Sequence, residues 1–149
     1  MEKTVKWGVI GSGGIARRRT IPEGIAHAKN AKLISVYDIN QDVNNVVAKD
    51  FNAIASKSIK DLLNTEVDVV YVASPVNMHL EHAVASAKAG KHVFSEKHLG
   101  LTIEEAEKMI KTCKNSDVYL GTGLMMRFIA QHQAALKLIQ DGKLGNPVY

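Results

Sequence analysis

The sequence predicts an α/β fold, a doubly wound parallel sheet of about six strands with helices on both faces. Three observations predict it: short apolar runs rich in β-branched residues recur, stretches of helical periodicity separate them, and a glycine-rich turn follows the first run. This alternation favours a parallel sheet, because right-handed crossovers place the helices on its two faces. We expect the strand order 3-2-1-4-5-6, with ligands bound outside the carboxyl ends of the strands where the order changes direction.

The first element is a buried strand over residues 5–10, which ends at the glycine-rich turn. In this turn Gly11, Gly13 and Ala16 have the spacing G-x-G-x-x-A that opens a dinucleotide-binding helix. Gly11 permits the tight turn, Gly13 lets backbone N–H groups approach a pyrophosphate, and Ala16 lets the helix pack closely on the sheet. The unpaired N–H groups at the helix N-terminus also favour an anion. The turn therefore predicts a pyrophosphate site.

The helix after this turn carries three consecutive arginines, Arg17 to Arg19, and contains Pro22. Because a proline removes a backbone donor and clashes with the preceding turn, we expect a kink or a restart there. We interpret the arginines as a solvated helix face; in the alternative, one or two of them reach the pyrophosphate. No aromatic residues interleave with this cluster, so the sequence does not indicate nucleic-acid binding.

The second strand ends in Asp38, which lies 22 residues after Ala16. A carboxylate at this point can accept hydrogen bonds from both ribose hydroxyls of an adenosine, and it repels a 2′-phosphate. The sequence therefore predicts NAD as the cofactor in preference to NADP. An alternative stays open, in which Asp38 only caps the helix that follows.

The later elements continue the alternation. We expect strands near residues 52–55, 67–73, 91–95 and 118–121, a brief helix over 58–63 and a last helix over about 130–141. Three further helices are predicted by apolar faces formed by Val43, Val46, Val47 and Phe51, by Leu80, Ala83, Val84 and Ala87, and by Ala106, Met109, Ile110 and Cys113. Thr102 and Glu105 have capping-box spacing, while Gly90 and Gly142 are expected to end helices.

The composition is that of a globular domain of ordinary size, with 149 residues, 46% of them apolar, and a formal net charge of +4. No apolar run approaches the ~20 residues of a membrane span, and the N-terminus lacks the apolar region of a signal peptide, so we expect a cytoplasmic protein without membrane contact. The single cysteine, Cys113, is predicted to be a buried structural thiol. No metal is expected, because no carboxylate or cysteine stands at ligand spacing around His79, His82 and His92.

Four longer motifs add a family resemblance to these patterns. They are residues 11–16 (GSGGIA), 73–79 (ASPVNMH), 89–97 (AGKHVFSEK) and 142–145 (GKLG). With them the sequence resembles, over essentially its whole length, the Gfo/Idh/MocA family of nicotinamide-dependent oxidoreductases, which act mostly on sugars, cyclitols and related hydroxy compounds. The resemblance implies a Rossmann fold and a small, sugar-like substrate for the complete enzyme.

The resemblance also implies roles for individual residues. The pyrophosphate loop corresponds to Gly11, Gly13, Gly14 and Ile15, the adenosine ribose ligand to Asp38, and the segment that lines the cofactor beyond the fourth strand to Ser74, Pro75, Asn77 and His79. Glu96 and Lys97 match the family's Glu-Lys-Pro motif, whose lysine lies near the nicotinamide and substrate. An ammonium there can stabilise negative charge on the reacting oxygen during hydride transfer, so Lys97 is the candidate catalytic residue. Arg127 belongs to a segment that resembles one approaching the nicotinamide.

The sequence departs from the family motif at His98, which stands in place of the proline. A proline permits a cis bond at small cost, whereas a cis bond before His98 costs about 2.5–4 kcal/mol. We therefore expect Lys97 to be aimed differently from the family's lysine. His98 is either a compensating titratable group, since a free histidine titrates near pH ~6.5, or a surface residue that only replaces the proline.

The resembled family has a C-terminal substrate domain that supplies an acid/base histidine with its aspartate partner. We expect residues 1–145 to form the NAD(P)-binding domain and 146–149 to begin a substrate domain that is missing here, so that the chain alone binds cofactor but turns over poorly. A non-catalytic dinucleotide-binding or sensing module is the alternative function. We also expect a homo-oligomer, because Ala135, Leu138, Ile139 and the tail 147–149 form an apolar surface that another copy can cover.

Overall fold

The computed structural model describes residues 3–145 and contains a six-stranded sheet whose strands all run parallel. Its strands are β1 (Val5–Ile10), β2 (Ala31–Tyr37), β3 (Ile54–Ala55), β4 (Val69–Val72), β5 (His92–Ser95) and β6 (Leu120–Thr122). Their order, β3-β2-β1-β4-β5-β6, is the predicted one. The order changes direction between β1 and β4, so the loops after these two strands lie at the crevice where such sheets bind ligands.

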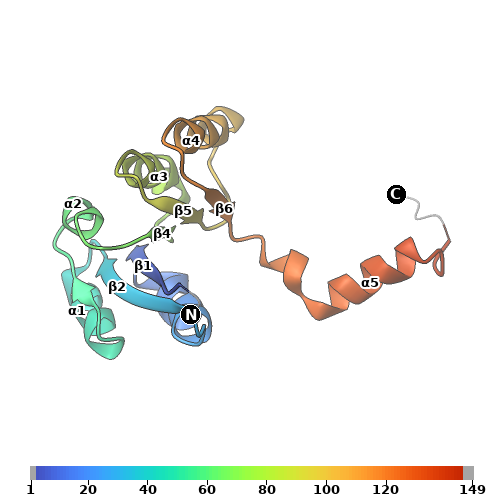
Figure 1. Ribbon diagram of the computed structural model, residues 1–149, viewed down its shortest axis with the longest axis horizontal. Helices are drawn as coiled ribbons and strands as arrows, with labels where there is room; N and C mark the ends of the chain where they lie inside the picture. The colour runs from blue at the N-terminus through green and yellow to red at the C-terminus, as the bar shows by residue number, and fades with distance from the viewer. Residues whose placement is uncertain (1–2, 146–149) are drawn as a thin grey trace.

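Helices cover both faces of the sheet (Figure 1). The helical elements are η1 (Ala16–Ile25), α1 (Gln41–Asp50), α2 (Ile59–Leu63), η2 (Val76–Met78), α3 (His79–Lys88), α4 (Ile103–Asn115), η3 (Met125–Phe128) and α5 (Ala130–Gln140). Helices α2, α3 and α4 bury one apolar cluster against the sheet, which includes Leu62, Ala83 and Met109. Helices η1 and α1 bury a second cluster on the opposite face, which includes Ile21 and Val47.

The helix that follows the glycine turn, η1, continues through Pro22 without the restart that was one of the two expectations for this position. The helix neither stops nor restarts there, because its turns are π-helical from Ala16 to Ile25 and Pro22 lies inside them. The wider turn is closed by the amide of Ala26, which donates to the carbonyl of Ile21 at 2.9 Å. Three of its side chains, Ala16, Ile21 and Ile25, are buried and hold it on the sheet.

Two predicted core positions lie on the solvent side of their helices. Val46 of α1 is 42% exposed and Ile110 of α4 is 54% exposed. On α1 the polar Asn44 is as fully buried as Val47, and its side-chain amide donates to the carbonyl of Ser56 at 2.8 Å. The buried face of a helix therefore differs from its apolar face. A polar side chain can occupy a core position when its hydrogen bonds are satisfied.

The ends of α4 and α3 follow the predicted signals with one difference. The hydroxyl of Thr102 accepts from the amide of Glu105 at 3.3 Å, as in a capping box. The returning carboxylate of Glu105 accepts from the amide of Leu101 at 2.7 Å, one residue earlier than expected. Gly90 has the positive φ of +72° that ends a helix without strain, directly after α3.

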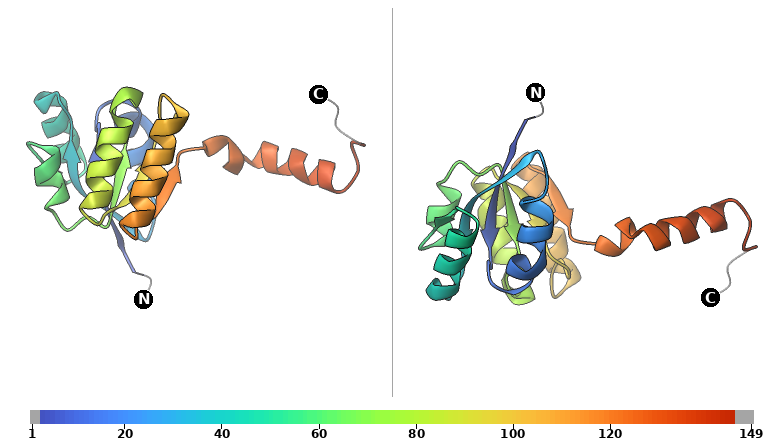
Figure 2. Two further views of the ribbon diagram at one scale, coloured as in Figure 1. Left: turned by 90° about the horizontal axis from the view of Figure 1, so that it is seen from above. Right: turned by 90° about the horizontal axis from the view of Figure 1, so that it is seen from below.

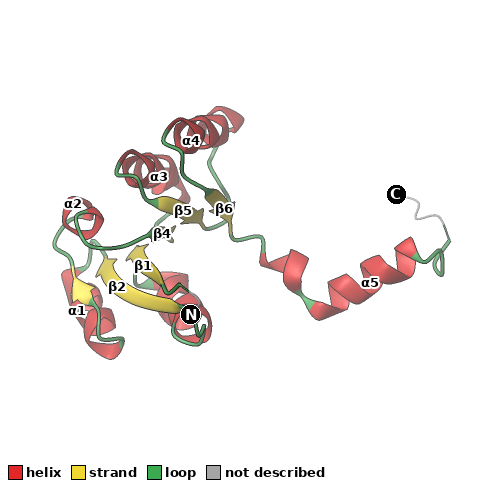
Figure 3. Cartoon of the chain, viewed as in Figure 1, coloured by secondary structure: helices red, strands yellow, loops and turns green. Residues whose placement is uncertain are grey.

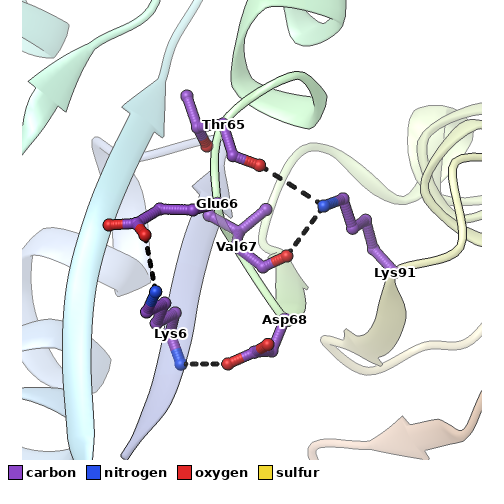
Figure 4. A network of polar contacts seen from close by, with 6 residues as sticks. All are labelled: Lys6, Thr65, Glu66, Val67, Asp68 and Lys91. Atoms are coloured by element: carbon purple, nitrogen blue, oxygen red, sulfur yellow. Dashed lines mark hydrogen bonds and ion pairs between the residues drawn. The ribbon is translucent and has the colours of Figure 1, made fainter.

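A polar network fastens the strands at the end of the sheet opposite the glycine turn (Figure 4). The side chain of Lys6 contacts Glu66 at 2.5 Å, and its backbone amide donates to Asp68 at 2.9 Å. The ammonium of Lys91 donates to the carbonyls of Thr65 and Val67 at 3.3 and 2.9 Å. These contacts join the starts of β1, β4 and β5, so the polar groups at this end of the sheet have a structural role.

Helix α5 extends away from the rest of the domain, as Figures 1 and 2 show. It follows the short turn η3, which is also red in Figure 3, and its contacts are mainly with that turn. Residues 130–145 are all exposed, and they include Leu136, Leu138 and Ile139. Within residues 3–145, no helix has the length and apolar character that a membrane crossing requires. Residues 146–149 lie outside the described part.

Candidate functional site

The glycine turn after β1 lies directly against the loop after β4. Gly11 has a φ of +84°, and a Cβ placed on it would lie 2.6 Å from the backbone nitrogen of Ser74. Its amide donates to the carbonyl of Tyr37 at 2.8 Å, which also fixes the turn to the end of β2. Only glycine combines this conformation with this close approach. The turn is therefore held between the loops that follow its two neighbouring strands.

Asp38 joins the glycine turn to the end of β2. Its Oδ2 accepts from the amide of Gly13 at 2.9 Å, and its Oδ1 accepts from the amide of Asn40 at 3.0 Å. The cap of α1 is Asn40, whose side chain accepts from the amides of Asp42 and Val43. Asp38 is therefore not the helix cap, and the two oxygens of its carboxylate retain lone pairs for further donors.

The outer part of the glycine turn is open. Gly14 has no atom within 4 Å of a Cβ placed on it, and the side chain of Ile15 is exposed. The arginines that follow are exposed and engaged at the protein surface: Arg17 pairs with Asp50 at 3.8 Å, Arg19 pairs with Glu23 at 2.6 Å, and Arg18 donates to the carbonyl of Gly14 at 3.3 Å. The solvated helix face is the interpretation that this geometry supports.

A cluster of histidines and serines stands behind the loop after β4. The Oγ of Ser74 lies 2.8 Å from Nδ1 of His82. The ring of His79 is only 1% exposed, and its nitrogens lie 2.8 Å from the carbonyls of Ser74 and His98. His79 thus ties the loop after β4 to the loop after β5 instead of facing open space. Burial lowers the pKa of His82, which favours a neutral ring that can accept the Ser74 proton.

Pro75 and Asn77 complete the predicted segment after β4, and both are exposed. Ser74 itself is partly buried at the start of this segment. Pro75 and Asn77 are therefore open to solvent, whereas Ser74 lies against the glycine turn.

The loop after β5 presents Glu96, Lys97 and His98. The carboxylate of Glu96 accepts from the Tyr71 hydroxyl through Oε1 at 2.5 Å and from the Lys97 amide through Oε2 at 3.1 Å. The side chains of Lys97 and His98 are exposed. The Lys97–His98 peptide bond is cis, although His98 stands where the family motif has a proline.

A cavity of about 750 Å³ opens beside Glu96, on the η1 face of the sheet. Its walls are mainly apolar and include Ile15, Phe94, Leu124 and Phe128, together with the polar groups of Thr20 and Glu96. Arg127 lies in η3, which contributes Met125 and Phe128 to the cavity, but the side chain of Arg127 is itself exposed. The cavity therefore connects the glycine turn with the end of β5.

The sequence patterns did not identify Tyr71 and Thr20 as members of this site. Tyr71 lies in β4, where a strand buried on both faces shows no polar alternation that could mark one side chain. Thr20 lies in the middle of η1, five residues beyond the glycine turn's Ile15. Within residues 3–145 no group of three His, Cys, Asp or Glu side chains could hold a metal ion.

The arrangement matches that of a known family. The model of the Gfo/Idh/MocA oxidoreductase family, with its NAD-binding Rossmann fold, matches residues 5–124. The chain belongs to this family. A curated family relative, the 1,5-anhydro-D-fructose reductase from Ensifer adhaerens, is 33% identical in an alignment of 146 residues that covers 96% of this chain and 43% of that protein.

Two solved structures show how far the similarity to Gfo/Idh/MocA enzymes extends. The WlbA dehydrogenase from Bordetella pertussis, in complex with NADH and UDP-GlcNAcA, has a TM-score of 0.89 and 28% identity over 98% of this chain and 42% of its own. A 3-ketoreductase from Actinomadura kijaniata, in complex with NADP, has a TM-score of 0.88 and 26% identity over 94% and 45%. The chain thus spans less than half the length of these relatives.

Proposed function

We propose that residues 1–145 form the cofactor domain of an oxidoreductase that transfers a hydride between NAD(H) and a sugar, cyclitol or related hydroxy compound. The observation that carries this proposal is the glycine turn, which is seated against Ser74 and tied through the Gly13 amide to the Asp38 carboxylate. This contact supports the proposal, because the turn that would bind the pyrophosphate and the carboxylate that would bind the ribose lie side by side.

The residues present fit a dinucleotide. The open backbone at Gly14 and Ile15 leaves room for a pyrophosphate, and the remaining lone pairs of Asp38 can accept from the adenosine ribose. The segment after β4 would line the cofactor through Ser74, Pro75 and Asn77, with His79 behind it. Because its carboxylate repels a 2′-phosphate, Asp38 favours NAD over NADP.

The reacting end would lie at the loop after β5. The nicotinamide, when bound, supplies or accepts the hydride. Lys97 would donate a hydrogen bond to the substrate oxygen and stabilise the negative charge that develops on it. Glu96 would hold the Lys97 backbone, and Arg127 would approach the same end from η3. His98 serves in this proposal as a surface residue of the loop.

The complete reaction would need a second domain. Relatives of this chain are more than twice its length, and we propose residues 146–149 as the start of the connection to a substrate domain. This chain alone would then bind cofactor with little turnover, since orientation of the substrate supplies a large share of catalysis. A cytoplasmic location, self-association and the absence of nucleic-acid binding belong to the same proposal.

The test is a calorimetric titration of the chain with NADH and with NADPH, repeated on Asp38→Ala. We expect NADH to bind more tightly than NADPH. Asp38→Ala should raise the Kd of NADH by roughly tenfold or more, which corresponds to the loss of one or two charge-assisted hydrogen bonds. Asp42→Ala, at an exposed carboxylate four residues further along the sequence, is the matched control and should bind NADH like the unchanged chain. Absence of binding by either cofactor would contradict the proposal.

A further inference from the structure

A chain of hydrogen bonds crosses the η1 face of the sheet and ends at the Lys97 backbone. Thr20 Oγ1 lies 3.0 Å from Tyr71 Oη, which lies 2.5 Å from Glu96 Oε1. The other oxygen of Glu96 accepts from the Lys97 amide at 3.1 Å. The contacts join η1, β4 and the loop after β5, three elements that are far apart in the sequence.

The direction of these bonds follows from the groups themselves. An ionised carboxylate can only accept, so the Tyr71 hydroxyl donates to Glu96. That hydroxyl has a single proton, and therefore the Thr20 hydroxyl donates to Tyr71. Tyr71 is fully buried, and this burial raises its pKa, so that it stays protonated and remains a donor.

Glu96 is held at both oxygens, and its surroundings restrict it further. A Cβ placed on Gly123 would lie 3.4 Å from Glu96 Oε1, so the backbone of β6's following loop packs against the carboxylate. Glu96 and Thr20 both line the 750 Å³ cavity, whereas the Tyr71 ring is packed in the core behind it. The position of the Glu96 carboxylate is therefore set from the core side by Tyr71.

We propose that Tyr71 is a positioning residue, whose hydroxyl fixes Glu96 and through it the Lys97 backbone at the nicotinamide end of the site. This inference rests on the proposed function for the place of the nicotinamide. It adds a residue that touches neither cofactor nor substrate, and it assigns Thr20 as the outer support of the same chain.

The hydrogen bonds of Thr20, Tyr71 and Glu96 are separate from the groups proposed to hold the rest of the cofactor. Asp38 and the Gly13 amide bind each other, and the described residues show no hydrogen bond between either of them and Tyr71 or Thr20. Loss of the Tyr71 hydroxyl should therefore disturb the nicotinamide end and leave the adenosine and pyrophosphate end unchanged. ADP-ribose, which has this second end but no nicotinamide, tests the difference.

The experiment measures the Kd of NADH and of ADP-ribose by calorimetry for the unchanged chain, Tyr71→Phe and Thr20→Val. Tyr71→Phe keeps the buried ring and removes only the hydroxyl. We expect it to raise the Kd of NADH by roughly five- to tenfold, the factor that corresponds to one net hydrogen bond, and to leave the Kd of ADP-ribose unchanged. Thr20→Val should act in the same direction and more weakly. Tyr119→Phe, at an exposed tyrosine just before β6, should alter neither Kd.

Each other outcome overturns the inference in a distinct way. Equal weakening of both ligands by Tyr71→Phe would show a general structural role, and an unchanged NADH Kd would show that the hydroxyl positions nothing. If Tyr71→Phe fails to fold, Thr20→Val decides alone by the same ratio of the two Kd values. Failure of the unchanged chain to bind either ligand would contradict the proposed function itself.

Discussion

Single residues define the crevice, and they do so through backbone contacts more than through side chains. Gly11 lets the first loop approach Ser74, the Gly13 amide holds Asp38, and the Lys97 amide binds Glu96. Of these contacts, the one between the Gly13 amide and Asp38 orients a side chain through a main-chain group of the loop after the neighbouring strand.

His82 gives this part of the molecule a pH dependence. Burial lowers its pKa below the ordinary value of about 6.5, and Nδ1 lies 2.8 Å from the Ser74 hydroxyl. Between the lowered pKa and ~6.5 the unfolded chain binds more protons than the folded one, so the free energy of unfolding must rise with pH there. Above that interval both states are neutral at this residue.

We therefore expect the free energy of unfolding, measured by urea denaturation, to fall as the pH is lowered from 7 through the interval below ~6.5. The His82 share of the slope has an upper limit of about 1.4 kcal/mol per pH unit, the value for one proton. His82→Gln should remove that share. Parallel curves for the variant and the unchanged chain would show that His82 does not titrate differently on folding.

At the scale of elements, the sequence was sufficient for the strands and their order and insufficient for the faces of some helices. Six apolar runs alternating with helical stretches allow few topologies, because crossovers are right-handed and short. Periodicity alone placed Ile110 beside Met109 and Cys113 in the core, yet Ile110 is 54% exposed while Met109 is fully buried. Which side of an apolar helix face is covered depends on the neighbouring helix, which for α4 is α3. The sequence pattern of α4 alone carries no information about the position of α3.

This difference within α4 predicts unequal costs of truncation. Met109→Ala should lower the free energy of unfolding by about 2–5 kcal/mol, because it leaves a cavity in the cluster between α3, α4 and the sheet. Ile110→Ala, its neighbour and matched control, should change it by less than about 1 kcal/mol. Urea denaturation of both variants measures this, and equal losses would show that α4 packs through a different face.

Spacing after strands predicted a place in the site for Gly11 and Asp38, whereas the role of Lys97 was predicted only through the family resemblance. The candidate site could not be predicted where the contact depends on packing across the sheet. Tyr71 is one of several apolar or aromatic residues in a buried strand, and only the folded structure shows that its hydroxyl reaches Glu96. The cis bond before His98 was likewise contrary to the expectation from its cost.

The whole molecule has an uneven distribution of buried surface. Two clusters hold the sheet and its covering helices together, whereas α5 extends away from them (Figure 2) and packs mainly on the turn before it. Its Leu136, Leu138 and Ile139 are exposed. An apolar surface of this kind in water favours association with another copy at high concentration.

We therefore expect the average mass of the chain, measured by light scattering, to rise with concentration. Replacing Leu138 and Ile139 together by Gln should shift the chain toward the monomer, because it removes apolar area from the contact at about 25 cal/mol per Å². Ile110→Gln, at an exposed isoleucine on α4, is the control and should associate like the unchanged chain. A monomer at all concentrations would contradict this expectation, whereas equal dissociation by both variants would place the contact on α4 as well as on α5.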